Sequence, residues 1–341
     1  MEVQFQLTLY LPFLLPRDSR DWGSDPIDYS RGDLRIRIVV LRQELAKDAP
    51  VGVDDLVATP QGTEPEFTIW QITSTPHKKF YDAIVVLVVG SVEKNEDLVK
   101  PVVRARFLNA AIGAARRFLN FCRALARDTE IYFNAPEVVP EYVRFAGFPH
   151  CQGWFDPYSG AALGDASTNF CSGEFVAGRS GINSIRWEAL REAVQSSGQP
   201  PVEVLSLLDA TIASANFDDR KAVLLAAISV EVAVKSFLQK TNFDKDQLKK
   251  LEDSLEIRFW EKYFDLLLPL AGQPSLKTAA PDLYKQIEVL FRVRNKIAHE
   301  GICYLEKDGK GHPMPLKHRE IGSLVSAAGH VVDWLDSLKI A

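Results

Sequence analysis

The second half of the chain is dominated by helical periodicity. From residue 202 onward, apolar residues recur every three or four positions in successive segments that are separated by short polar connections. These segments are 202–215, 219–239, 248–271 with breaks, 281–298 and 317–337. Amphipathic helices joined by short loops bury their apolar sides against one another, so this half is expected to form an antiparallel helical bundle.

Residues at the segment borders agree with that interpretation. Asp218 and Asp219 stand where acidic residues cap and charge the start of a helix. Pro281 is suited to the first position of the next helix, and Gly301 to the position just past its end. The borders therefore support the same helices as the periodicity.

The first half of the chain has a different period. In MEVQFQLTLYL, apolar residues from Val3 to Leu11 alternate with more polar ones, which predicts a half-buried strand. The start lacks the basic region of a secretory signal. Further strand-like segments lie at 34–41, 66–73 and 81–92, and a helical one at 104–127. We therefore expect an N-terminal α+β domain.

The connection between the two halves is rich in turn residues. A short helix is predicted near 187–194, and SSGQPP at 196–201 is typical of a linker. This divides the chain into an α+β domain over 1–195, whose role is open with a sensor or regulatory function as one candidate, and a helical bundle over 202–341. The glycine-rich stretch 151–182 is interpreted as loop, because it lacks the lysine and strand-to-helix setting of a phosphate-binding P-loop.

The composition and charge of the chain exclude some classes of function. A formal charge of −5 over 341 residues argues against a protein that coats nucleic acid through its overall field, so any nucleic-acid site must be local. The four cysteines show no CxxC spacing, which favours a reducing compartment. His150, Cys151 and Cys171 lack the spacing of a zinc site. We expect a cytoplasmic protein that spans no membrane and needs no cofactor or metal.

The segment FRVRNKIAHEG, residues 291–301, carries the strongest functional signal. Arg294 continues an apolar seam whose other members are Leu283, Ile287, Leu290 and Ile297. A guanidinium buried there would need a carboxylate, a phosphate or a subunit interface as partner. On the helix over 219–239, Glu231 has the same kind of position. It is a candidate to orient Arg294, and the alternative is a simple pair with Lys235 one turn on.

RNKIAH resembles the R-x4-6-H motif of HEPN domains, and the resemblance extends over roughly residues 203–338. It implies a dimeric, metal-independent endoribonuclease in which arginine and histidine from both subunits meet in one cleft. The expected products are a 2′,3′-cyclic phosphate and a 5′-hydroxyl. The spacing is also matched by Arg144 with His150 and by Arg292 with His299, but Arg294 and His299 have the helical context of the family.

Within that resemblance, His299 would exchange protons with the RNA 2′-hydroxyl or the leaving oxygen, because histidine titrates near neutral pH. Arg294 would hold the phosphate and its developing charge. Asn295 would orient the imidazole or contact the phosphate, and Arg292 and Lys296 would add to an RNA-facing patch. The structural alternative makes Arg294 an ion-pair residue and His299 a helix C-terminal group favoured by the dipole.

Helix geometry constrains this pair. Five residues rotate by about 500°, so Arg294 and His299 lie roughly 140° apart around one straight helix, whereas Arg292 and His299 are nearly aligned. Either the helix loosens near Ala298, or a dimer brings two helices together. The dimer accounts better for the pair.

The function expected from the sequence is therefore an RNA-cleaving homodimer. The resemblance also implies toxin or antiphage defence as its setting and leaves room for a neutralising or sensing partner. Two alternatives stay open. One is a non-catalytic HEPN-containing dimer that binds or senses a ligand, and the other is a regulated partner of a nucleotidyltransferase.

Overall fold

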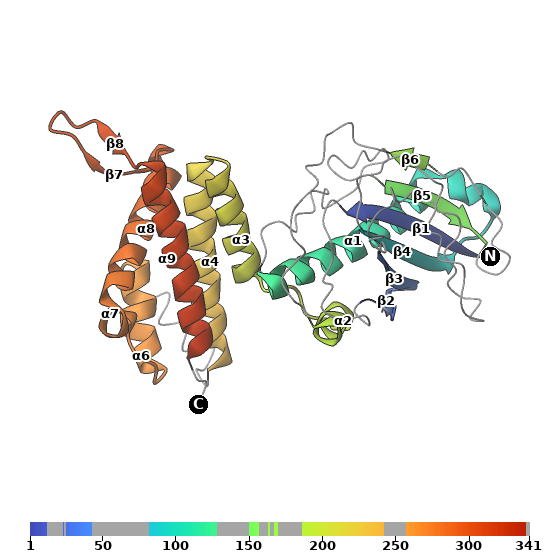
Figure 1. The fold of residues 1–341 in the computed structure, drawn as a ribbon, viewed down its shortest axis with the longest axis horizontal. Helices are drawn as coiled ribbons and strands as arrows, with labels where there is room; N and C mark the ends of the chain where they lie inside the picture. Colours follow the sequence, from blue (N-terminus) through green and yellow to red (C-terminus); the bar gives the residue numbers. More distant parts are fainter. Residues whose placement is uncertain are drawn as a thin grey trace, which may run out of the picture. The chain divides into compact units, whose positions relative to one another are not determined.

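The computed structural model describes residues 1–11, 23, 25–42, 82–127, 150–156, 163, 167–169, 186–241 and 257–338. The chain divides into two compact units, Met1–Pro200 and Pro201–Ala341, and each is described by itself. Unit 1 holds an antiparallel sheet with helices, and unit 2 is mostly helical (Figure 1). This is the α+β region followed by a helical region that the two periodicities predict.

Six described strands of unit 1 form one antiparallel sheet in the order β2-β3-β4-β1-β5-β6. The strands are β1 Glu2–Leu11, β2 Ile27–Arg31, β3 Leu34–Arg42, β4 Asp82–Ser91, β5 His150–Phe155 and β6 Ser167–Asn169. After the short 3-10 helix η2, Asn95–Val99, the helices are α1 Pro101–Ala126 and α2 Trp187–Gln195.

Helix α1 covers one face of the sheet through an aromatic cluster. Trp154 of β5 lies between Phe5 of β1 and Phe107 of α1, with ring centroids 5.0 and 4.9 Å away. All three side chains belong to a single buried core with the apolar residues of β3 and β4. The α1 helix is amphipathic as predicted, and its apolar side provides the cover that the sheet needs.

The prediction of a half-buried first strand was wrong. Gln4, Gln6 and Thr8, the polar side of β1, are as buried as the apolar side, and the Gln6 amide donates to the Thr8 hydroxyl at 3.3 Å. Strand β1 pairs with both β4 and β5, so it is an inner strand of the sheet, and both of its faces are covered. Alternation shows which side is apolar, but it cannot show that the polar side is covered.

The interpretation of 151–182 as loop was wrong where the structure describes it. Strand β5 pairs with β1 from His150 to Phe155, and β6 pairs with β5. Trp154 and Phe155 are buried in this strand. The many glycines of this stretch obscured the short alternating pattern of β5. The strand predicted at 66–73 lies outside the described residues.

Unit 2 contains the predicted helices. They are α3 Val202–Ala215, α4 Asp219–Lys240, the π-helix η3 Glu261–Leu267 continuing into α6 Leu268–Leu270, α7 Leu276–Ala279, α8 Pro281–Glu300 and α9 His318–Ser337. A hairpin of β7 Tyr304–Lys307 and β8 Pro313–Pro315, which the sequence did not reveal, joins α8 to α9. Residues 248–256 of the predicted third segment lie outside the described residues.

Helix α4 is the centre of the bundle and contacts α3, α8 and α9. Among the described helices it alone is long and apolar enough to cross a membrane by length and composition, but 56% of its apolar window is buried inside the protein. That burial is the mark of a core helix. At its start the Asp218 carboxylate accepts from the Lys221 amide at 3.2 Å, which confirms the predicted cap.

The close packing of α1 on the sheet at Gly90 leads to a stability prediction. A β-carbon added at Gly90 of β4 would overlap the Leu34 side chain and lie 3.1 Å from the Phe107 ring. We expect Gly90→Ala to lower the free energy of unfolding by about 1–3 kcal/mol, as overpacking does in a close-packed core. Urea denaturation measures this. In Gly198→Ala the added carbon only reaches ordinary contact at 3.4 Å from Ser196, so a comparable loss there would contradict the packing argument.

Candidate functional site

Helix α8 carries the motif residues of the candidate site. It runs without a break from Pro281 to Glu300 and ends at Gly301, whose φ of 73° is the left-handed conformation that glycine adopts readily. Ile287, Leu290 and Ile297 on its inner side are fully or nearly buried. This confirms the predicted start and stop of the motif helix, which reaches two residues beyond the predicted 281–298.

Arg294 lies on the inner side of α8 as its spacing predicts, but it is not a buried charge. Its side chain is half-buried because the inner side of α8 opens into a pocket beyond Phe291. The hypothesis of a fully buried guanidinium in a closed seam was therefore wrong. The period of a helix gives the direction of a side chain, and the neighbouring elements decide whether anything covers it.

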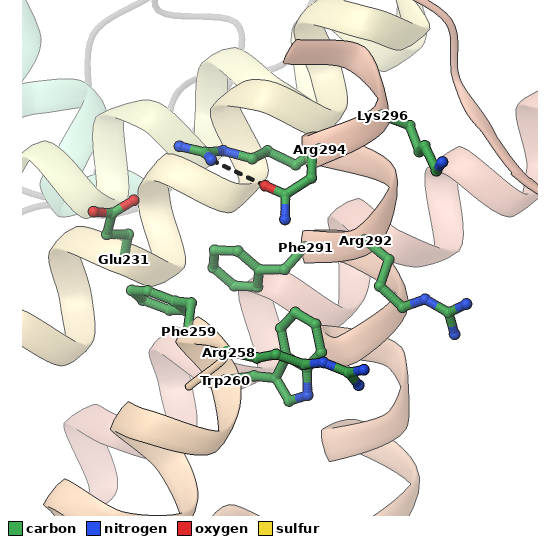
Figure 2. Close-up of a pocket in the computed structure, with 9 residues that line it drawn as sticks. Glu231, Arg258, Phe259, Trp260, Phe291, Arg292, Arg294 and Lys296 are labelled. Atoms are coloured by element: carbon green, nitrogen blue, oxygen red, sulfur yellow. Dashed lines mark hydrogen bonds between the residues drawn. The ribbon is translucent and has the colours of Figure 1, made fainter. Parts of the chain in front are cut away.

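The pocket has a volume of about 560 Å³ (Figure 2). Three elements contribute its walls: α8, the residues just before η3, and one residue of α4. The lining residues are Phe291, Arg292, Arg294, Asn295 and Lys296 of α8, then Arg258, Phe259 and Trp260, and finally Glu231 of α4. Arg294 extends toward the side that carries Glu231, whereas Arg292 and Lys296 extend from α8 in the other direction (Figure 2).

Arg258, Phe259 and Trp260 were missed at the sequence level. The run RFW combines a cation with two aromatic rings, and Tyr263 and Phe264 follow after two charged residues. Single-stranded nucleic-acid sites also combine cations with aromatic rings, but Trp260, Tyr263 and Phe264 are buried in the core here. The helical period of the segment over 248–271 does not distinguish residues that line a pocket from aromatic residues of the core.

The aromatic floor of the pocket is a stacked pair. The Phe259 ring lies 4.3 Å from the Phe291 ring at an interplanar angle of 25°, and Trp260 packs behind Phe291 with its ring 6.5 Å away. Phe291 and Trp260 are buried, but Phe259 is half-buried and keeps part of its ring accessible. The Phe259 ring also lies 4.5 Å from the Tyr263 ring at an interplanar angle of 33°, so it belongs to an aromatic cluster that is fixed at the edge of the core.

The cations of the pocket differ in their partners. Arg258 lies 4.0 Å from Glu261, Arg292 lies 3.8 Å from Glu288, and Lys296 lies 3.2 Å from Glu300. Exposed pairs of this kind contribute at most about 1 kcal/mol each. The third pair is reinforced by Tyr304, whose hydroxyl donates to Glu300 at 2.5 Å.

The pKa of Lys296 is raised by Tyr304 and then by Glu300, and the pKa of Glu300 is lowered by the same hydroxyl and by Lys296. Both groups therefore keep their charges at neutral pH. A closed pair of this kind leaves Lys296 less free than an isolated lysine to contact an anion.

Arg294 is the exception among these cations. In the described part of the chain its contact is a hydrogen bond from Nη1 to Oδ1 of Asn295 at 3.1 Å, and no carboxylate pairs with it. Asn295 thus contacts Arg294, and not His299. Glu231 lines the same pocket but accepts from Lys235 at 2.8 Å, which is the simple pair that the sequence left open. Most donors of the Arg294 guanidinium remain available to a ligand.

His299 is exposed in the last turn of α8 and does not line the pocket of Arg294. Because α8 stays helical through Glu300, the two side chains diverge by about 140°, and the loosened helix end that could have joined them does not occur. One chain therefore does not bring Arg294 and His299 together. The rival Arg144 and the side chain of His150 lie outside the described residues, as does Cys171.

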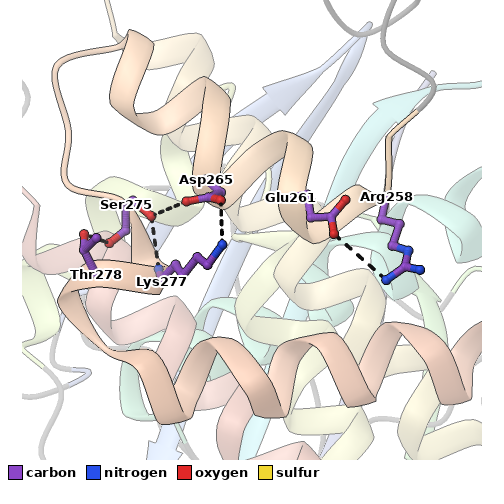
Figure 3. Close-up of polar contacts among 6 residues, drawn as sticks. All are labelled: Arg258, Glu261, Asp265, Ser275, Lys277 and Thr278. Atoms are coloured by element: carbon purple, nitrogen blue, oxygen red, sulfur yellow. Dashed lines mark hydrogen bonds and ion pairs between the residues drawn. The ribbon is translucent and has the colours of Figure 1, made fainter.

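The π-helix beside the pocket is held in place by polar contacts (Figure 3). Asp265 accepts from the Ser275 hydroxyl at 2.8 Å and lies 3.5 Å from the Lys277 ammonium, while Ser275 also accepts from the Lys277 amide and caps α7. π-helical turns are rare and occur often at functional sites. These contacts fix the segment that carries Phe259 and Trp260 into the pocket.

Comparison with protein-family models found no match, and comparisons with curated proteins and with solved structures found no significant match. In the parts of the chain that the structure describes, no group of three or more histidine, cysteine or acidic residues is placed to hold a metal ion. The arguments for function therefore rest on the residues of the site.

The half-buried position of Arg294 leads to a stability prediction. Because its guanidinium contacts a neutral amide and solvent, Arg294→Ala should change the free energy of unfolding by less than about 1 kcal/mol. Leu290→Ala, one turn earlier and fully buried, should cost about 2–5 kcal/mol. Chemical denaturation of both variants measures the contrast. A loss of about 3 kcal/mol or more for Arg294→Ala would restore the buried ion-pair hypothesis.

Proposed function

We propose that the protein is a metal-independent endoribonuclease that acts as a dimer through a HEPN-like site built on Arg294 and His299. The observation that carries the proposal is the state of Arg294. It points into a pocket with further cations and a stacked aromatic pair, and no described carboxylate neutralises it. A guanidinium without a carboxylate partner, beside aromatic side chains, is suited to the phosphate of an RNA strand.

The proposed reaction is an internal transfer at phosphorus. The RNA 2′-oxygen attacks the adjacent phosphorus as a base accepts its proton, and the bond from phosphorus to the 5′-oxygen breaks as an acid protonates the leaving oxygen. The products are a 2′,3′-cyclic phosphate and a 5′-hydroxyl. Arg294 stabilises the charge on the non-bridging oxygens, and Asn295 orients the guanidinium through their hydrogen bond.

The dimer supplies what one chain lacks. Since Arg294 and His299 diverge around α8, a two-fold contact would place Arg294 of one protomer near the partner's His299. Two imidazoles in one cleft could then serve as the base and the acid. His299 is exposed at the end of a helix, so it is accessible to a second copy.

The biological setting that we propose is toxin or antiphage defence, on the strength of the RNKIAH resemblance. One observation favours a second function, because the pocket of Arg294 does not include His299. The protein would then bind RNA or another anionic ligand at this pocket without cleaving it. The variants described next separate the two functions.

The decisive variants are His299→Ala and Arg294→Ala. Each should reduce cleavage of single-stranded RNA by about 100-fold or more, because they remove the proton-transfer group and the phosphate-binding group. Arg292→Ala is the matched control. It removes the same charge from the same helix, but its side chain is exposed and paired with Glu288, so cleavage should fall by less than about 10-fold, mainly at high salt.

The assay should contain EDTA, since the proposed chemistry uses no metal, and the products should be analysed for the cyclic phosphate. A folded His299→Ala protein that cleaves RNA at the wild-type rate would refute the nuclease. Wild-type protein that binds RNA but never cleaves it would support the binding function instead.

Dimer formation is a separate expectation of the composite site. Light scattering of the full chain at micromolar concentration should give twice the mass of one chain. A monomer that retains full cleavage activity would show that the two side chains work without a partner, which the geometry of α8 opposes.

A further inference from the structure

A second cavity lies within unit 1, remote in sequence from the RNKIAH helix. Its volume is about 500 Å³, and its walls come from β2, α1, the end of α2 and the residues that follow α2. Helix α2 contacts both α1 and β2, and the cavity is an open hollow at the surface where these three elements meet. The lining residues used in the argument are Tyr29, Arg31, Gly113, Arg117, Gln195 and Ser197.

Arg117 of α1 builds one wall of the cavity. Its guanidinium donates to the carbonyl oxygens of Val194, Ala193 and Ser196 at 2.7, 3.0 and 2.6 Å. These are carbonyls at the end of α2, which lack partners within the helix. Arg117 is thus a structural residue that ends α2, and it also contributes a fixed positive charge to the cavity.

Arg31 at the end of β2 has a different character. Its side chain is exposed, and among the described residues no hydrogen bond or ion pair engages its guanidinium. A β-carbon added at Gly113 would come within 2.8 Å of the Arg31 Nη1 atom. Glycine inside a helix costs about 1 kcal/mol relative to alanine, so Gly113 is unfavourable for α1 but leaves space for Arg31.

The remaining polar side chains are neutral hydroxyls and amides, which can donate hydrogen bonds. Burial raises the pKa of Tyr29 to about 12, against the opposing effect of the Arg117 and Arg31 charges, so its hydroxyl keeps its proton at neutral pH. The Gln195 amide is oriented by its hydrogen bond to the Asp28 carbonyl at 3.0 Å. No carboxylate is among the described lining residues. The cavity therefore combines positive charge with donors and has no competing acid.

We propose that this cavity binds the phosphate group of a small molecule of nucleotide size. Arg31 supplies a planar pair of donors that matches phosphate oxygens, and the hydroxyls of Tyr29 and Ser197 supply further donors. The volume exceeds what one phosphate fills and lies within the usual range of small-molecule pockets. This site is independent of RNA cleavage and gives unit 1 a ligand of its own.

Isothermal titration calorimetry of the full chain tests the proposal with AMP, inorganic phosphate and adenosine. AMP should bind, and adenosine should bind at least about 10-fold more weakly, because it lacks the group that Arg31 recognises. Phosphate that binds as tightly as AMP would identify free phosphate as the ligand and still support the site. Adenosine that binds as tightly as AMP would overturn the proposal.

Variants assign the binding to this cavity. Arg31→Ala should weaken AMP binding by about 10-fold or more. Gly113→Ala should also weaken AMP binding, since the added methyl group displaces the Arg31 guanidinium without removing its charge. The melting temperature of this variant should be at least that of the wild-type protein, because alanine is more favourable than glycine inside a helix. Arg104→Ala, an exposed position on α1 outside the cavity, is the matched control and should leave binding unchanged.

Arg294→Ala separates this site from the pocket in unit 2 and should not alter AMP binding. No binding of AMP or phosphate at millimolar concentration would overturn the proposal. So would equal AMP binding by the wild-type protein and a folded Arg31→Ala variant.

Discussion

The packing of α8 into the core of unit 2 is the constraint on which the candidate site depends. Ile287, Leu290 and Ile297 are held in a close-packed interior, so the helix is fixed in its rotation about its own axis. Once that rotation is fixed, Arg294 faces inward and His299 faces outward. The separation of the two motif residues within one chain is thus a consequence of core packing, and a composite site is the arrangement that would reconcile them.

The chemistry of the pocket follows from the same packing. Phe291 of α8 is buried, and together with Tyr263 it packs against the Phe259 ring. Contacts of Asp265 with Ser275 and Lys277 keep the π-helix that follows Phe259 tied to α7. The aromatic cluster therefore rests on two elements that are both anchored, so a bound ligand would meet a surface that is already ordered.

The two cavities share one property although they lie in different units. Each is lined by an arginine that no described carboxylate neutralises, Arg31 in unit 1 and Arg294 in unit 2. Several other described arginines contact carboxylates, as Arg37 does with Asp28 through two hydrogen bonds of 2.7 Å. Guanidinium groups left open beside hollows are the groups that anionic ligands use. The surroundings differ, since hydroxyl and amide donors accompany Arg31 and aromatic rings accompany Arg294.

The sequence by itself determined the elements: the alternating first strand, the helices of unit 2, the Asp218 cap and the Gly301 stop all follow from local period and local backbone preference. It also determined the direction in which Arg294 points. Only the tertiary structure decided whether other residues cover each side chain. The polar side of β1 is as buried as its apolar side, and the inner position of Arg294 is open because its neighbours leave a pocket. Coverage depends on residues distant in sequence, and a local pattern contains no information about them.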